Sequence, residues 1–246
     1  MCDCGGQSGA GWKGWRPLPA RCECRAVGDW IDLSHPLTRE LPRVALFPKP
    51  VFEQIKRMPQ DPMNVTRMEM VVHMGTHLDA PCHFFTDAPS LESVPLERLG
   101  GRGIVWPVEV GATELVGPHH LAGLEGRLQD GDILILDTGS HPFVGSVRYD
   151  DDHPTLSLAA ADWIVDHGVK MLAVDTPTPD LSLARRTAGF DWPVHKRLLS
   201  NGVLIAEHLT NLAPLRGKTV EVFCGALNIV GGDGAPARFV ARAIEE

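Results

Sequence analysis

One segment of eleven residues, 73–83 (HMGTHLDAPCH), constrains this chain more than any other. Three imidazoles and one carboxylate lie within it, at positions 73, 77, 79 and 83. Because side chains alternate between the two faces of a strand, these four odd positions would share one face and apolar neighbours the other. A polar face rich in ligands, backed by an apolar face, is what a metal site on the wall of a sheet requires.

The spacing of these side chains also demands a bend. A straight strand rises about 3.3 Å per residue, so His73 and His77 would lie about 13 Å apart, too far to share one ion. A helix would bring them together, but Gly75 and Pro81 disfavour a helix. Gly75 lies midway between the two histidines and adopts backbone angles that other residues avoid. We therefore expect a bent segment in which His73, His77 and Asp79 converge on one ion.

The last histidine of the segment, His83, has two interpretations. It lies four residues beyond Asp79, so it could be a fourth ligand or a free imidazole beside the metal. A hydrolytic site keeps one position open for water and needs a base nearby, which favours His83 as a proton shuttle. The alternative for the whole segment is a polar face that binds no ion.

A weaker signal lies downstream, at His195 and Glu207. Glu207 ends the apolar run of residues 203–206, and a buried carboxylate without a partner costs several kcal/mol. A metal would supply that partner, so both residues are candidate ligands. Mixed imidazole and carboxylate ligands suit zinc and manganese alike, and they exclude an all-oxygen calcium site. His208 follows Glu207 directly, so on a strand it would point to the opposite face.

The rest of the chain predicts one α/β domain over residues 28–246. Alternating or continuous apolar runs predict strands at residues 29–33, 66–72, 103–110, 132–137, 170–175, 203–207 and 220–229. Apolar periodicity predicts a helix over residues 157–167, with Ser157 as its cap and Gly168 at its end. Pro193 suits the first turn of a second helix, which we expect to end at residue 199.

Residues 1–27 are rich in glycine and cysteine and show no sustained periodicity, so we expect a flexible N-terminal extension. Its cysteines could make a tetrahedral metal site, although their one-residue spacing is tighter than that of common zinc knuckles. They are Cys2, Cys4, Cys22 and Cys24.

Composition excludes several classes of partner. The 246 residues include 31 acidic and 23 basic side chains, a formal charge of −8, without the basic cluster of a phosphate-backbone binder. We therefore expect no nucleic-acid partner. There is no run of roughly 18 apolar residues, which predicts no membrane span. The first residues lack the apolar core of a secretory signal, so we expect a cytoplasmic protein with reduced cysteines.

These motifs resemble those of the cyclase family of metal-dependent hydrolases, which includes bacterial kynurenine formamidases and isatin hydrolases. Residues 73–83 are similar to the family motif HxGTHxDxPxH. Four flanking segments resemble further parts of the family: 32–37 (DLSHPL), 94–99 (VPLERL), 168–175 (GVKMLAVD) and 195–212 (HKRLLSNGVLIAEHLTNL). The resemblance covers roughly residues 28–243.

The resemblance implies a swivelling β/β/α fold with a central barrel-like sheet. It also implies one or two zinc ions per subunit, or manganese instead, bridged by Asp79 and Glu207, with His83 as the catalytic histidine. Family members form homodimers or higher oligomers such as homotetramers, with the active site near a subunit boundary. The residues that match the family's metal ligands are His73, His77, Asp79, His195 and Glu207.

The activity implied is cleavage of an amide-type C–N bond in a small molecule by metal-bound hydroxide. Within the family, the resemblance favours an arylformamidase of tryptophan catabolism, similar to the kynurenine formamidases. Residues 45–48 (ALFP) stand where formamidases carry a Trp-Pro pair that packs on the substrate, so Phe47 is the expected apolar wall. Two alternatives are a lactam-opening enzyme like isatin hydrolase and a metal-binding protein without catalysis. A Cys82 nucleophile paired with His83 is disfavoured because adjacent strand residues point in opposite directions.

Overall fold

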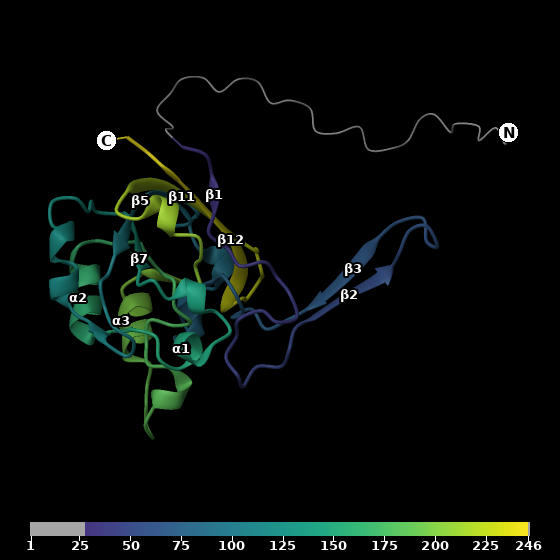
Figure 1. Ribbon diagram of the computed structural model, residues 1–246, viewed down its shortest axis with the longest axis horizontal. Coiled ribbons are helices and arrows are strands. Elements are labelled where there is room, and N and C mark those ends of the chain that lie inside the picture. Colours follow the sequence, from purple (N-terminus) through teal and green to yellow (C-terminus); the bar gives the residue numbers. More distant parts are fainter. Residues whose placement is uncertain (1–27, 246) are drawn as a thin grey trace.

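An eight-stranded sheet forms the centre of the computed structural model, which describes residues 28–245 (Figure 1). Across the sheet, the strands are β1 (Ile31–Asp32), β12 (Gly234–Ala243), β11 (Thr219–Ala226), β5 (Gly100–Pro107), β7 (Ile133–Asp137), β9 (Met171–Val174), β10 (Leu204–Glu207) and β4 (His77–Asp79). Because β12 also pairs with β4, the strands from β12 to β4 close into a barrel. The expected α/β fold with a barrel-like sheet is confirmed, whereas the N-terminal extension lies outside the described residues.

Two helices, α2 (Leu158–Asp166) and α3 (Pro193–Ser200), cover one side of the barrel (Figure 1). The Ser157 hydroxyl caps α2 by accepting a hydrogen bond from the backbone N–H of Ala160, at 3.1 Å. Gly168, with φ of +68°, follows α2 in the left-handed conformation that commonly ends a helix. Both helices were expected at these positions.

The strands β5, β7, β9 and β10 run parallel. Every residue of β7, β9 and β10 is buried, which explains their largely apolar sequences. In β7, Ile133 and Ile135 belong to the cluster inside the barrel. Leu134 and Leu136, which alternate with them, pack in a second cluster with residues of α2 and α3. The barrel therefore has a filled interior and an outer apolar layer beneath the helices.

The longest strand, β12, was not expected from the sequence. It is rich in alanine and contains Pro236, and neither residue favours a strand. Its pairing with three other strands, β1, β4 and β11, outweighs these weak preferences. The further elements missed by the sequence analysis are α1 (Val147–Asp150), β2 (Val51–Lys56), β6 (Leu115–Val116) and β8 (Thr155–Leu156).

Strands β2 and β3 (Val65–Glu69) form a separate antiparallel hairpin that projects from the barrel (Figure 1). The strand expected at residues 66–72 is therefore part of this hairpin and ends earlier, at Glu69. The strand expected at 220–229 likewise ends early, at Ala226, and the one expected at 103–110 begins and ends three residues earlier. None of the helices within residues 28–245 is long and apolar enough to cross a membrane.

We predict that Phe239→Ala lowers the free energy of unfolding by about 3–5 kcal/mol, because the fully buried ring would leave a cavity in the barrel. Urea denaturation of the purified protein measures this change. The matched control is Phe223→Ala in the neighbouring strand, where the side chain is 55% exposed and the expected change is about 0.5 kcal/mol. Equal changes in the two variants would contradict the assignment of β12 to the barrel wall.

Candidate active site

The bend expected in the histidine-rich segment lies at Gly75. Its φ is +60°, and its N–H donates to the carbonyl of Pro42 at 2.8 Å. A Cβ at this position would collide with the Leu41 side chain, so only glycine fits. The bend separates His73, which lies in a loop, from His77, which begins β4.

Strand pairing brings Glu207, from the downstream candidate segment, beside the histidine-rich segment of residues 73–83. β4 runs antiparallel to β10, and Glu207 lies directly opposite His77. Because residues two apart share a face, Asp79 points to the same side as His77. All three side chains are buried, with at most 6% of any residue exposed.

The imidazole of His77 is held so that one nitrogen has no protein partner. Its Nδ1 lies 2.7 Å from the carbonyl of Gly75, which can only accept, so Nδ1 carries the proton. Among residues 28–245, the buried Nε2 has no hydrogen-bond partner, and it lies 3.3 Å from Asp79 Oδ1 and 3.4 Å from Glu207 Oε2. A lone pair facing two carboxylate oxygens is repulsive unless a cation lies between them. This arrangement fits a bound metal ion.

Asp180 orients the imidazole of His195 at the start of α3. Its carboxylate accepts from the backbone N–H groups of Val194 and His195, at 3.1 and 2.9 Å, and lies 2.7 Å from His195 Nδ1. The opposite nitrogen, Nε2, therefore points towards Glu207 Oε1 at 3.1 Å and Asp79 Oδ2 at 3.5 Å. A carboxylate behind a histidine is the usual support of a metal ligand. The sequence analysis missed Asp180. One signal could have indicated such a residue: the side chain of Trp192, which precedes α3, cannot cap the helix, so the first N–H groups of α3 need another acceptor.

The five candidate ligands form one cluster. Asp79 and Glu207 each face both His77 and His195, as bridging ligands would. Ligand atoms of Asp79, His195 and Glu207 all lie within 4.8 Å of one another. The candidate ligands that the structure brings together are His73, His77, Asp79, His195 and Glu207.

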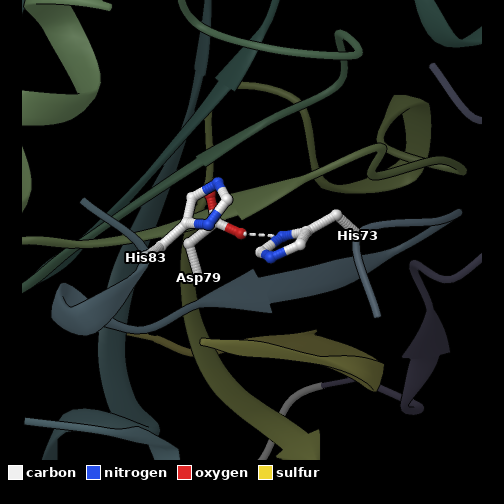
Figure 2. A group of neighbouring side chains, drawn as sticks. All are labelled: His73, Asp79 and His83. Atoms are coloured by element: carbon white, nitrogen blue, oxygen red, sulfur yellow. Dashed lines mark hydrogen bonds and ion pairs between the residues drawn. The ribbon is translucent and has the colours of Figure 1, made fainter. Parts of the chain in front are cut away.

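His83 lies beside His73 and Asp79 (Figure 2), and ligand atoms of these three residues all lie within 4.8 Å of one another. The rings of His73 and His83 stack with centroids 4.0 Å apart. His73 Nδ1 lies 2.7 Å from Asp79 Oδ1, and its Nε2 lies 3.0 Å from Asp233 Oδ2. The same Asp233 oxygen is 3.4 Å from His83 Nδ1. Asp233 was missed with β12, because it lies in the turn that precedes that strand.

The electrostatic surroundings shift the pKa values of His73 and His83 in opposite directions. Burial opposes the charged form of His73, but the charge of Asp79 and its hydrogen bond outweigh burial and raise the pKa of His73 to about 9. For His83, burial is the largest effect and lowers the pKa. His83 is therefore neutral at pH 7 and able to accept a proton.

The expectation for His208 was wrong. β10 ends at Glu207, and His208 has φ of +57°, so its side chain turns towards the site instead of the opposite face. Its ring centroid lies 5.9 Å from that of His77. Its Nδ1 is 2.8 Å from the hydroxyl of Tyr149, which is fully buried. Residues other than glycine rarely adopt this backbone conformation, so no local pattern predicts it at this position.

A cavity of about 710 Å³ opens beside the ligand cluster. Phe47, the expected apolar wall, lines it together with Phe84 and His83. Cys82 does not pair with His83, since its thiol donates to the carbonyl of Gly232 at 3.3 Å and burial raises its pKa. The arrangement thus offers a candidate metal-binding cluster, a neutral imidazole and an aromatic-lined cavity.

Comparison with known proteins agrees with this geometry. The Cyclase family profile matches residues 31–181. A kynurenine formamidase from Salinibacter ruber is 30% identical over 186 residues, which cover 73% of this chain and 80% of that protein. A kynurenine formamidase from Bacillus cytotoxicus is 26% identical over 220 residues, or 88% of this chain and 98% of that protein.

Solved structures share the fold. Isatin hydrolase A from Labrenzia aggregata superposes with a TM-score of 0.79 at 22% identity, covering 89% of this chain and 94% of that one. The profile match spans more than half of the chain, and the formamidases align over most of their own length. The chain therefore belongs to the cyclase family.

Proposed function

We propose that this protein is a metal-dependent hydrolase that cleaves the formamide C–N bond of an aryl formamide. The observation that carries the proposal is the buried Nε2 of His77, directed at two carboxylates beside an aromatic-lined cavity. The names of the relatives, kynurenine formamidases, support the formamide as the bond that is broken.

In this proposal, His73, His77 and Asp79 would hold one ion. His195 and Glu207 would hold a second, and Asp79 and Glu207 would be the ligands common to both. A divalent ion such as zinc or manganese supplies a Lewis acid there and lowers the pKa of water towards 7.

The protein's own residues would transfer the protons and bind the substrate. His83 is neutral, faces the cavity and is backed by Asp233, so it can take a proton and deliver it to the leaving nitrogen. Charge on the His83 ring during this transfer is stabilised by the Asp233 carboxylate. Phe47 and Phe84 offer apolar surface to an aromatic ring. Water thus adds to the formyl carbon, and the products are formate and an arylamine.

We also propose a homodimer or homotetramer. Large apolar side chains on the projecting β2–β3 hairpin are exposed, including Ile55, Met58, Met63 and Met68. Contact with a second copy would remove them from water.

We predict that the metal-loaded protein hydrolyses N-formylkynurenine and that a chelator abolishes this activity. Formate release, measured with and without chelator and after restoring zinc or manganese, checks it. Absence of turnover by fully loaded protein would contradict the formamidase proposal and direct the same assay to cyclic lactams such as isatin.

Substitutions should separate metal binding from proton transfer. We expect Asp79→Asn to lose both bound metal and activity, because a neutral amide cannot bridge two cations. His83→Gln should keep its metal while kcat falls by about 10²–10⁴-fold, the usual range for a general acid–base group. Elemental analysis beside steady-state kinetics checks both. A full metal content in both Asp79→Asn and His77→Ala would contradict the ligand assignment.

Metal and protons should compete for His73. Its pKa of about 9 lies above the usual 6.5, so in metal-free protein it is protonated at pH 8 and must lose that proton on binding metal. The stability contributed by this charge is present below pH 6.5 and is lost as the pH rises through about 9. Calorimetric titration with zinc in two buffers of different ionisation enthalpy should reveal proton release at pH 8.

Asp233→Asn provides the matched variant for that titration. Asp233 contributes to the raised pKa of His73, so removing its charge should lower this pKa and reduce the protons released at pH 8. Identical proton release in both proteins would show that Asp233 does not act on His73.

A further inference from the structure

Arg186 lies in the cavity wall, where the carboxylates of Asp180 and Glu207 act on its charge from beyond ion-pair distance. Its Nε donates to the carbonyl of Leu181 at 2.9 Å. Within residues 28–245, its guanidinium forms no ion pair with a carboxylate. A half-buried guanidinium keeps its charge, so the remaining N–H groups are available to a ligand in the cavity.

Two aromatic rings hold this guanidinium in place. Its central carbon lies 5.0 Å from the ring centroid of Phe190 and 5.0 Å from that of Trp192. Cation–π contact on two rings fixes the plane of the guanidinium and reduces the entropy lost when it binds a ligand. Trp192 is itself fixed at φ of +46°, a conformation that is costly for a bulky residue.

The aromatic rings connect Arg186 to the reacting end of the cavity. Trp192 lies 6.0 Å from Phe84, centroid to centroid. Phe84 in turn lies 4.6 Å from His83 and 5.1 Å from His195. An aromatic substrate lying along Phe84 and Trp192 would thus have its formamide at the metal ligands and its far substituent near Arg186.

Arg43, another arginine of the cavity wall, lacks the aromatic support that Arg186 has. Within residues 28–245, no aromatic ring supports the guanidinium of Arg43, which donates to the carbonyl of Val44 at 3.4 Å. Arg186 is therefore the cavity-lining arginine, within the described part of the chain, that has two aromatic supports and no carboxylate at ion-pair distance.

We propose that Arg186 is a specificity-determining residue that binds a carboxylate on the substrate, at the end of the molecule remote from the scissile formamide. The substrate class is an aryl formamide with an acidic side chain on its ring. The inference rests on the proposed function for the bond that is cleaved. A guanidinium presents a planar fork of N–H groups that matches a carboxylate, whereas a neutral bicyclic lactam offers no group to fill it.

A pair of formamides that differ only in charge tests the proposal. The probes are 4-(2-formamidophenyl)-4-oxobutanoate and its primary amide. We expect the metal-loaded wild type to prefer the carboxylate by about 10- to 100-fold in kcat/KM, mainly through KM, because hydrogen bonds to charged groups are strong. Arg186→Gln should bring this ratio close to one, and Arg186→Lys should retain part of it.

Arg148→Gln is the matched control. Arg148 also stacks on an aromatic ring, that of Phe143 at 3.6 Å, but it is exposed and does not line the cavity. This variant should keep the wild-type ratio. A wild-type ratio near one, or a ratio that survives in Arg186→Gln, would overturn the proposal.

Binding of the arylamine products separates this inference from the proposed function. Calorimetry with 4-(2-aminophenyl)-4-oxobutanoate and its amide needs no turnover. Preference of the wild type for the carboxylate product, lost in Arg186→Gln, would support the Arg186 subsite even if no formamide is hydrolysed. Equal affinity for the two products would refute the subsite even if formamides are hydrolysed.

Discussion

Two buried carboxylates, Asp79 and Glu207, share the same set of imidazoles, and the surrounding structure offsets their repulsion. Burial alone would raise the pKa of Asp79, yet the His73 charge and hydrogen bonds from His195 and His73 hold that pKa well below its usual range. Removing one partner from such a set leaves a buried charge uncompensated, which is costly. The cluster is therefore a site that the fold supports only when positive charge, from protons or metal, is present.

The barrel provides that support from several distant parts of the chain. β4 lies between β10 and β12, which brings His77 opposite Glu207 and places the turn carrying Asp233 beside His73. α3 begins at the same edge, and Asp180 both caps it and orients His195. Because one carboxylate does both tasks, the position of the helix and the direction of the imidazole are coupled.

Much of this arrangement could be predicted from local sequence, and the remainder depends on contacts between distant residues. Continuous apolar runs predicted the buried strands, and the histidine spacing around Gly75 predicted the bend. Asp233 could not be found, because it meets His73 from 160 positions away and precedes a strand of unfavourable composition. His208 was placed wrongly because a positive φ reverses its direction. The roles of the candidate ligands stay predictions.

The closure of the barrel also has a consequence for biosynthesis. Chains leave the ribosome N-terminus first, so the residues of β4 emerge long before those of β12, which must cover the free edge of β4. Until then, His77 and Asp79 lie on an open strand, and Asp233 has not yet reached His73. Pairing over such long separations is slow compared with local contacts. The cluster of imidazoles and carboxylates is thus completed late, so in a nascent chain the histidines are exposed before their carboxylate partners are in place.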